Sequence, residues 1–364
     1  IGDNQWFRFR ELSMTVFVAD EGLLGLGELV PSHCEIRWYS GRDIPRPLLD
    51  GADALLVRST ARVSAHNLPE SIRYIGTATI GTDHLPLKSL LDQQIAVASA
   101  PGCNAFAVTD YVLSHLFSWA KSRGRAVDDL TLGIIGVGAV GSLLHTRAQM
   151  IGIRTLLSDQ PRFDVGDLSE HMPLADVVRQ SDVISLHVPR VTEGNYVTDR
   201  LLDDKALSRI KRQALLINAS RGQVLHEHDL LKQTHFDLVL DVFPSEPVIS
   251  DALISRSWRI SPHIAGHSAE GKYRGTKQII KNAASQFGFQ LNALDEETFL
   301  ETIAGSRPIG HSSMESILKA CPMAETDRAL RERVFRAFEM EKPDLFDEVR
   351  KSYQLRRESE FSPL

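Results

Sequence analysis

The stretch Thr131-Leu-Gly-Ile-Ile-Gly136-Val-Gly138-Ala-Val-Gly141 decides the fold. It opens with a short apolar run that is typical of a buried parallel strand. After the turn, residues 140–148 carry apolar side chains at helical spacing. A strand, a glycine-rich turn and a helix in this order predict a dinucleotide site, with the phosphates facing the helix N-terminus. Gly136 would permit the tight turn, Gly138 would let the backbone approach a pyrophosphate, and Gly141 would let helix and strand pack closely.

A second strand-like run, residues 153–158, leads to Asp159, which lies 18 positions after Gly141. An acidic side chain at about this distance bonds the adenosine ribose diol in dinucleotide folds. Because Asp159 would repel a 2′-phosphate, the sequence favours NAD over NADP as the cofactor. Two observations weigh against this interpretation: Arg162 lies close by, and an aspartate can simply cap the end of a strand.

Strand-like and helix-like runs alternate along most of the chain. Asn104 is expected to cap a long helix over residues 105–123, which Gly124 ends. The alternation predicts an α/β fold with doubly wound parallel sheets. The other strands are expected at residues 15–19, 54–58, 73–78, 95–98, 183–187, 214–218 and 238–242.

A long helical pattern over residues 268–287 follows the last expected strand. We expect this helix to return to the first domain, which makes that domain discontinuous. We expect a flavodoxin-like substrate domain (14–104 with 268–290), a Rossmann-type NAD-binding domain (105–267) and a small C-terminal module (295–364). Residues 288–311 are expected to be a linker, and the charged segment 346–358 a solvated helix. Residues 1–13, before Met14, are interpreted as a leader, either upstream translated sequence or a non-native addition.

The composition excludes several classes of function. The chain has 364 residues, enough for two or three domains, and a net charge of −6 with no basic face, so we expect no nucleic-acid partner. No apolar run approaches the length of a membrane span and the start lacks a signal-peptide pattern, so we expect no membrane association. Cys34, Cys103 and Cys321 are widely spaced and odd in number, which favours free thiols in a reducing cytoplasm and argues against a metal site.

Three polar residues, Arg221, Glu246 and His263, each follow a strand-like run downstream of the glycine turn. In open α/β sheets, ligands bind beyond the carboxyl ends of the strands. A guanidinium can clamp a carboxylate, an imidazole can take a hydroxyl proton near neutral pH, and a carboxylate can hold that imidazole in place. Each residue alone could equally cap a turn or lie on the surface. Together, in this order, they predict hydride transfer at a 2-hydroxy acid.

The runs around these residues resemble those of the D-isomer-specific 2-hydroxyacid dehydrogenases, a family whose catalytic set is Arg, Glu and His in that order. Within the family, the chain most resembles the branch that oxidises 4-phospho-D-erythronate in vitamin B6 (pyridoxal phosphate) biosynthesis. The resemblance extends over nearly all of the chain from Met14 onward. The runs that carry it are Val57-Arg58-Ser59, Gly76-Thr-Ala-Thr79-Ile-Gly-Thr-Asp-His84, Ala100-Pro-Gly-Cys-Asn-Ala105 and His263-Ile-Ala-Gly-His-Ser-Ala-Glu-Gly-Lys272.

The resemblance implies roles for further residues. Ser59 and Thr79 would contact the substrate, and His267 stands where a tyrosine near the substrate is common. The C-terminal module would make the protein a homodimer. The substrate phosphate needs cationic partners, for which Arg58 is one candidate. The residues implied to line the cofactor site are Asp159, Val188, Asp241 and Gly266.

Arginines of the tail, supplied by a partner subunit, are the alternative partners for the phosphate. These are Arg350, Arg356 and Arg357, although they could simply form a solvated helix face.

The expected activity is therefore NAD-dependent oxidation of a phosphorylated 2-hydroxy acid. His263 would remove the C2 hydroxyl proton, Arg221 would hold the C1 carboxylate, and Glu246 would stabilise the imidazolium. Two alternatives stay open. One is another dehydrogenase of the family, of the 3-phosphoglycerate or hydroxypyruvate type. The other is a non-enzymatic, NAD-sensing scaffold like the C-terminal binding protein corepressors.

Overall fold

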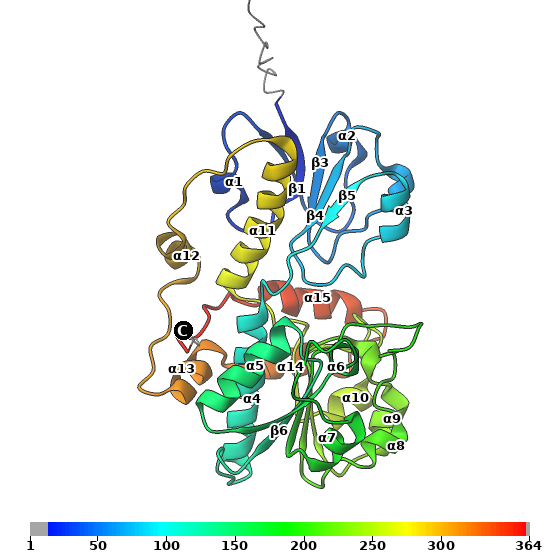
Figure 1. Cartoon of the computed structure of the whole chain (residues 1–364), viewed down its shortest axis with the longest axis vertical. Coiled ribbons are helices and arrows are strands. Elements are labelled where there is room, and N and C mark those ends of the chain that lie inside the picture. Colours follow the sequence, from blue (N-terminus) through cyan, green and yellow to red (C-terminus); the bar gives the residue numbers. More distant parts are fainter. Residues whose placement is uncertain (1–13, 362–364) are drawn as a thin grey trace, which may run out of the picture. The chain divides into compact units, whose positions relative to one another are not determined.

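The computed structural model describes residues 14–361, so the expected leader, residues 1–13, lies outside the described residues. The described chain divides into two compact units. Unit 1 comprises residues 14–103 and 272–296, and unit 2 comprises residues 104–271 and 297–361 (Figure 1). The C-terminal residues group with unit 2, and their assignment to a separate module stays a prediction.

Unit 1 is built on a five-stranded parallel sheet with the strand order β2-β1-β3-β4-β5. All five residues of β1 are buried, as is usual for a central strand of a parallel sheet covered on both faces. The long helix α11 (Ala269–Phe287) packs on the sheet, where the Tyr74 hydroxyl donates to the Ile279 carbonyl over 2.6 Å. The other elements are β1 (Val16–Asp20), α1 (Leu26–Leu29), β2 (Glu35–Tyr39), α2 (Arg46–Leu49), β3 (Ala54–Val57), η1 (Ala65–Asn67), β4 (Tyr74–Thr77), α3 (Leu87–Asp92) and β5 (Ala96–Ala98).

Unit 2 is built on a six-stranded parallel sheet with the strand order β11-β10-β9-β8-β6-β7. The chain runs outward from β6 to β7 and then crosses back to β8, so the topological switch point lies between β6 and β8. In such sheets the ligand crevice lies outside the carboxyl ends of the strands at that point. The strands are β6 (Thr131–Ile135), β7 (Arg154–Ser158), β8 (Val183–Leu186), β9 (Leu215–Asn218), β10 (Asp237–Leu240) and β11 (Arg259–Ile260).

Helices cover both faces of the six-stranded sheet, and the side chains of β9 alternate between the two cores. Leu215 and Ile217 pack with α4 and α5, whereas Leu216 packs with the helices on the opposite face. This period of two explains why the whole strand is apolar. The helices are α4 (Ala105–Ser122), α5 (Ala139–Met150), α6 (Gln160–Asp164), α7 (Leu174–Gln180), α8 (Asp204–Leu207), η2 (Gly222–Val224), α9 (Glu227–Lys232) and α10 (Asp251–Arg256).

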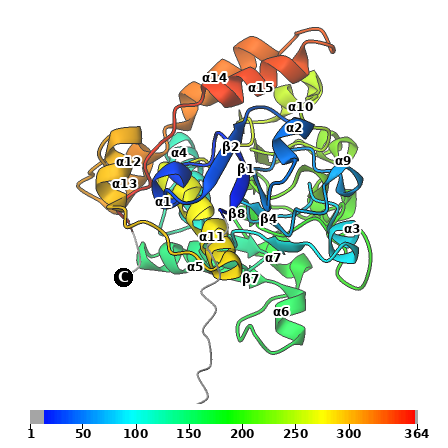
Figure 2. The same ribbon diagram turned by 90° about the horizontal axis from the view of Figure 1, so that it is seen from above.

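The C-terminal part differs from two expectations. The expected linker contains a helix, α12 (Glu296–Ala304), and the expected solvated helix over residues 346–358 ends early. Helix α15 (Lys342–Ser352) stops at Ser352, and residues 353–361, here called the C-terminal strap, continue without a helix, with residues 356–359 buried. Helices α13 (Ser313–Ala320) and α14 (Met323–Val334) precede α15, and α14 lies beside α15 (Figure 2).

Within residues 14–361, no helix is both long and apolar enough to cross a membrane.

Candidate active site

The glycine turn between β6 and α5 has the steric features that a dinucleotide requires. Gly136 has a φ of +90°, a conformation that L side chains rarely adopt. A Cβ on Gly141 would lie 2.0 Å from the Gly136 carbonyl oxygen, so the helix can approach the turn this closely only without a side chain. A Cβ on Gly138, by contrast, would meet nothing within 4 Å, which leaves open space at the N-terminus of α5. The turn therefore fits a pyrophosphate.

Asp159, at the carboxyl end of β7, reaches back to the glycine turn. Its Oδ2 accepts from the Val137 amide over 2.7 Å and its Oδ1 from the Arg162 amide over 3.2 Å. The side chain therefore caps the N-terminus of α6 and also lies at the glycine turn, where a ribose diol would be bound. The Arg162 guanidinium pairs with Asp167 over 2.8 Å and also donates to the Val137 carbonyl.

Val188, just beyond β8, packs against the same turn. Its Cγ1 lies 2.9 Å from the position that a Cβ on Gly136 would take. Because β6 and β8 are neighbours in the sheet, Val188 and the glycine turn flank the switch point between them. A residue that lines a cofactor site in this fold would lie at this position.

Arg221, Glu246 and His263 all follow the carboxyl ends of three adjacent parallel strands, β9, β10 and β11. The strand ends are in register, with Asn218 opposite Leu240 and Leu240 opposite Ile260. The three loops therefore leave the sheet at the same edge.

Glu246 and His263 form a hydrogen-bonded pair. The Nδ1 of His263 lies 2.9 Å from the Oε2 of Glu246, and the Oε1 of Glu246 accepts from the Phe243 amide over 2.7 Å. An ionised carboxylate can only accept, so Nδ1 of the imidazole carries a proton, and in the neutral ring Nε2 holds the lone pair. The pair thus presents a base at Nε2.

The charge state of Glu246 suits this arrangement. Burial by itself would raise the pKa of the Glu246 carboxyl, but the neighbouring His263 ring and the Phe243 amide outweigh burial and lower that pKa. Glu246 is therefore an anion at neutral pH.

The loop of Arg221 packs directly against the chain that leads to Glu246. A Cβ on Gly222 would lie 1.9 Å from the Phe243 carbonyl oxygen, so only glycine allows this approach. The Arg221 backbone carbonyl accepts from the Asn218 side chain over 3.0 Å, and its own guanidinium donates to the Ser220 carbonyl over 2.9 Å. The Arg221 side chain is half-buried at this edge of the sheet.

Asp241, which the resemblance assigns to the cofactor, is buried and holds the loop of His263. Its Oδ1 accepts from the Ser261 hydroxyl over 2.6 Å and from the Ile264 amide over 2.8 Å, and its Oδ2 accepts from the Ala265 amide over 2.9 Å. His263 itself has a φ of +56°, a left-handed conformation that costs a residue other than glycine on the order of 1 kcal/mol. The carboxylate of Asp241 therefore fixes a strained loop, a role that the sequence did not indicate.

Gly266 and His267 continue this loop. A Cβ on Gly266 would lie 2.2 Å from Nδ2 of Asn104, so glycine lets the start of α4 approach the loop. Asn104 precedes α4 as expected, but its side chain makes no capping hydrogen bond. The His267 ring lies 6.4 Å from the Tyr353 ring, centroid to centroid.

The candidate substrate residues of unit 1 follow its strands β3 and β4. Arg58 pairs with the buried Asp20, Nε to Oδ1, over 2.7 Å, and about a third of its side chain is exposed. The Thr79 hydroxyl donates to the Gly81 carbonyl over 2.7 Å and also contacts Thr77, so it shapes its own loop. Ser59 is exposed.

Two of the three tail arginines that the sequence offered as phosphate partners are not exposed. Arg356 and Arg357 are buried within their own chain, with 8% and 3% of their surface exposed. Arg357 pairs with Glu270 over 2.7 Å and with Glu297 over 2.6 Å. Neither forms a solvated helix face or offers its guanidinium to a partner subunit. Local charge pattern cannot reveal such burial, because it depends on acceptors supplied from far along the chain.

Comparison with known proteins identifies the relatives of the chain. Residues 104–265 match the sequence model described as "D-isomer specific 2-hydroxyacid dehydrogenase, NAD binding domain". The chain is 38% identical over 353 residues to an erythronate-4-phosphate dehydrogenase of Cronobacter sakazakii, covering 94% of this chain and 91% of that one. It is 39% identical over 352 residues to the enzyme of the same name from Enterobacter sp. (strain 638), with the same coverage, 94% and 91%.

Among solved structures, the NAD⁺-bound 3-phosphoglycerate dehydrogenase of Entamoeba histolytica is similar with a TM-score of 0.65 at 20% identity, covering 77% of this chain and 99% of that one. At this level of identity the likeness concerns the fold alone.

Proposed function

Since this chain belongs to the D-isomer-specific 2-hydroxyacid dehydrogenase family, we propose that it oxidises 4-phospho-D-erythronate to 2-oxo-3-hydroxy-4-phosphobutanoate with NAD, as a step of vitamin B6 biosynthesis. The substrate is supported by the name of the relatives, which match over about nine-tenths of both chains. The chemistry is supported by one observation above all, the pairing of His263 Nδ1 with Glu246, which makes Nε2 the basic nitrogen of the neutral ring.

The cofactor would be held by the glycine turn and its neighbours. The α5 N-terminus and Gly138 would receive the pyrophosphate, and the Asp159 carboxylate would accept from the ribose hydroxyls. Val188, Asp241 and Gly266 would line the same site. Bound NAD⁺ supplies the hydride acceptor.

The residues of the chain would carry the rest of the reaction. Arg221 would clamp the C1 carboxylate of the substrate, which orients C2. Nε2 of His263 would take the proton of the C2 hydroxyl as the C2 hydrogen departs with its electron pair, which leaves a carbonyl at C2. The Glu246 carboxylate would stabilise the imidazolium that forms.

We propose Ser59, Thr79, Arg58 and His267 as substrate contacts. Arg58 is the cation that we assign to the phosphate. Its partly exposed guanidinium and its fixed pairing with Asp20 support this choice, because an oriented guanidinium suits phosphate oxygens.

The oligomer and the compartment are also proposals. We propose a homodimer formed through the C-terminal part, supported by Phe338 and Met340, which expose 78% and 90% of their surface between α14 and α15. A monomer in light scattering would contradict it. The free thiols of Cys34, Cys103 and Cys321 support a cytoplasmic location.

A substrate panel tests the proposed function. NADH formation should be fastest with 4-phospho-D-erythronate, and slower with 3-phospho-D-glycerate and D-glycerate. The kcat/KM for unphosphorylated D-erythronate should be about 10- to 100-fold lower, because one charge-assisted contact is lost. A higher kcat/KM for 3-phospho-D-glycerate than for 4-phospho-D-erythronate would instead identify the chain as a 3-phosphoglycerate dehydrogenase. No turnover of any 2-hydroxy acid would contradict the proposal.

A further inference from the structure

A buried guanidinium of the C-terminal strap binds the backbone of the loop that follows His263. Nη1 of Arg356 donates to the Ile264 carbonyl over 3.2 Å and to the His267 carbonyl over 2.9 Å. Its Nη2 donates to the Ala265 carbonyl over 2.6 Å. One side chain, 93 positions beyond His263 along the chain, thus contacts three carbonyls of a four-residue stretch.

The same guanidinium is anchored to the body of unit 2. Nη2 of Arg356 donates to the Ala107 carbonyl in the first turn of α4 over 2.9 Å, and Nη1 contacts the Tyr353 hydroxyl over 2.9 Å. The Arg356 carbonyl accepts from the Ala269 amide over 2.9 Å. Arg356 therefore links the His263 loop to α4, which packs on the sheet.

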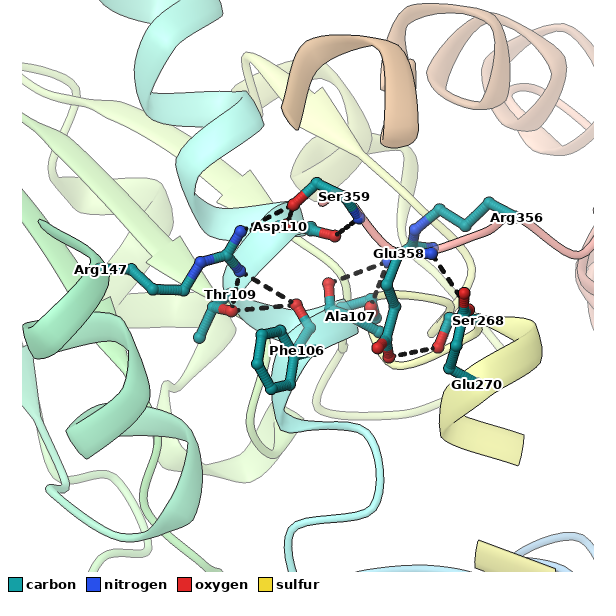
Figure 3. Close-up of polar contacts among 11 residues, drawn as sticks. Phe106, Ala107, Thr109, Asp110, Arg147, Ser268, Glu270, Arg356, Glu358 and Ser359 are labelled. Atoms are coloured by element: carbon teal, nitrogen blue, oxygen red, sulfur yellow. Dashed lines mark hydrogen bonds and ion pairs between the residues drawn. The ribbon is translucent and has the colours of Figure 1, made fainter. Parts of the chain in front are cut away.

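Neighbouring strap residues fasten the segment on both sides of this contact (Figure 3). The Ser268 hydroxyl donates to Glu358 over 2.8 Å. The Ser359 hydroxyl donates to Asp110 over 2.6 Å and accepts from Arg147 over 2.8 Å. Asp110 and Arg147 are fully buried and paired over 2.6 Å. The strap is therefore held in unit 2 by several side-chain hydrogen bonds.

Arg356 and Asp241 bind the backbone of the same two residues, Ile264 and Ala265. Asp241 accepts from the amides of Ile264 and Ala265, and Arg356 donates to the carbonyls of these same residues. The loop so held contains the left-handed backbone of His263, which needs its surroundings to keep it in place. Because Nδ1 of His263 must meet Glu246, a shift of this loop would disturb the orientation of the ring.

We propose that Arg356 is a positioning residue for the reaction, which acts by fixing the loop of His263 and touches neither substrate nor cofactor. This inference rests on the proposed role of His263 as the base. It assigns to the C-terminal strap a contribution to turnover in addition to its contribution to folding.

The test compares Arg356→Lys with Arg147→Lys. Lysine keeps the charge but replaces the planar fork with a single nitrogen, which cannot reach all of these carbonyls. Arg147 is a matched control, since it is buried and bonds the same strap at Ser359 but contacts no residue of the loop in the described interactions. Both variants are assayed with NAD⁺ and 4-phospho-D-erythronate at a temperature where thermal unfolding shows them folded.

We expect Arg356→Lys to lower kcat by about 10-fold or more with KM changed less than about threefold, and to alter the pH profile of kcat, because proton transfer depends on ring orientation. Arg147→Lys should lose thermal stability but keep kcat within about twofold. Equal kcat losses in the two variants, or an unchanged kcat in folded Arg356→Lys, would overturn the inference.

A second measurement does not depend on turnover. Hydrogen–deuterium exchange of the peptide 261–269 should be about 10-fold faster in Arg356→Lys than in the wild-type chain, and should stay near the wild-type rate in Arg147→Lys. Unchanged exchange in Arg356→Lys would overturn the inference even if the wild-type chain failed to oxidise 4-phospho-D-erythronate. That failure by itself would contradict only the proposed function.

Discussion

Nδ1 of His263 lies 2.9 Å from Oε2 of Glu246, and the other oxygen of this carboxylate is already engaged by the Phe243 amide. The carboxylate can therefore neither turn away nor donate, and it fixes the proton of the imidazole on Nδ1. This relationship defines which ring nitrogen can serve as the base, and it makes the role of Glu246 testable by substitution.

Glu246→Gln should lower kcat by about 10²- to 10⁴-fold. A glutamine oxygen can still accept from the Phe243 amide, but its amino group then faces Nδ1 of His263 and favours the wrong tautomer. Steady-state kinetics with NAD⁺ and 4-phospho-D-erythronate measure the effect, with Ser245→Ala as the control on the same loop. A Glu246→Gln enzyme with near-normal kcat would show that the tautomer does not matter.

Glu246 should also contribute to a pH dependence of stability. Its pKa is lowered in the folded chain, so between the folded value and the ordinary value near 4.5 the unfolded chain binds more protons, and stability rises with pH. The contribution is present above pH 4.5 and is lost as the pH falls through the folded pKa. In urea unfolding, Glu246→Gln should therefore lose more unfolding free energy relative to the wild-type chain at pH 6 than at pH 3.5. An equal loss at both pH values would contradict this prediction.

The glycines of the turn should separate folding from cofactor binding. Gly141→Ala would place a Cβ 2.0 Å from the Gly136 carbonyl oxygen and should destabilise the fold by on the order of 3 kcal/mol. Gly138→Ala meets open space, so its melting temperature should stay near that of the wild-type chain while its affinity for NAD falls. Thermal unfolding and NAD titration by fluorescence measure the two effects. A reversed pattern would contradict the assignment of the turn.

Asp159 should determine the choice between NAD and NADP. Asp159→Ala removes the acceptor for the ribose hydroxyls and should raise KM for NAD about 10- to 100-fold, with a smaller change for NADP. Asp159→Asn, which keeps one acceptor oxygen for the Val137 amide, is the matched control and should lose less affinity for NAD. An unchanged ratio of NAD to NADP efficiency in Asp159→Ala would refute this role.

The sequence predicted those features whose physical requirements are local. The glycine turn and the apolar strands β6 to β10 are specified by steric demands and burial that a short window contains, and the end of each strand then places Arg221 and Glu246. Strand β2 escaped prediction because it is an edge strand whose Glu35 and Arg37 are only half-buried, so its pattern lacks the apolar run of the central strands.

The C-terminal strap could not be predicted from its own residues. Arg356 and Arg357 lie in a charged stretch that is typical of a solvated helix, yet both are buried because their acceptors come from residues about 50 to 250 positions away. The left-handed backbone of His263 and the contacts of Asp241 with its loop are likewise set by tertiary packing.

The turnover of His263→Ala tests the central claim most directly. With NAD⁺ and 4-phospho-D-erythronate, the wild-type chain should form NADH, and His263→Ala should lower kcat by roughly two to four orders of magnitude while NAD still binds. NADH formation by His263→Ala at a near-normal rate would contradict the assignment of this imidazole as the base.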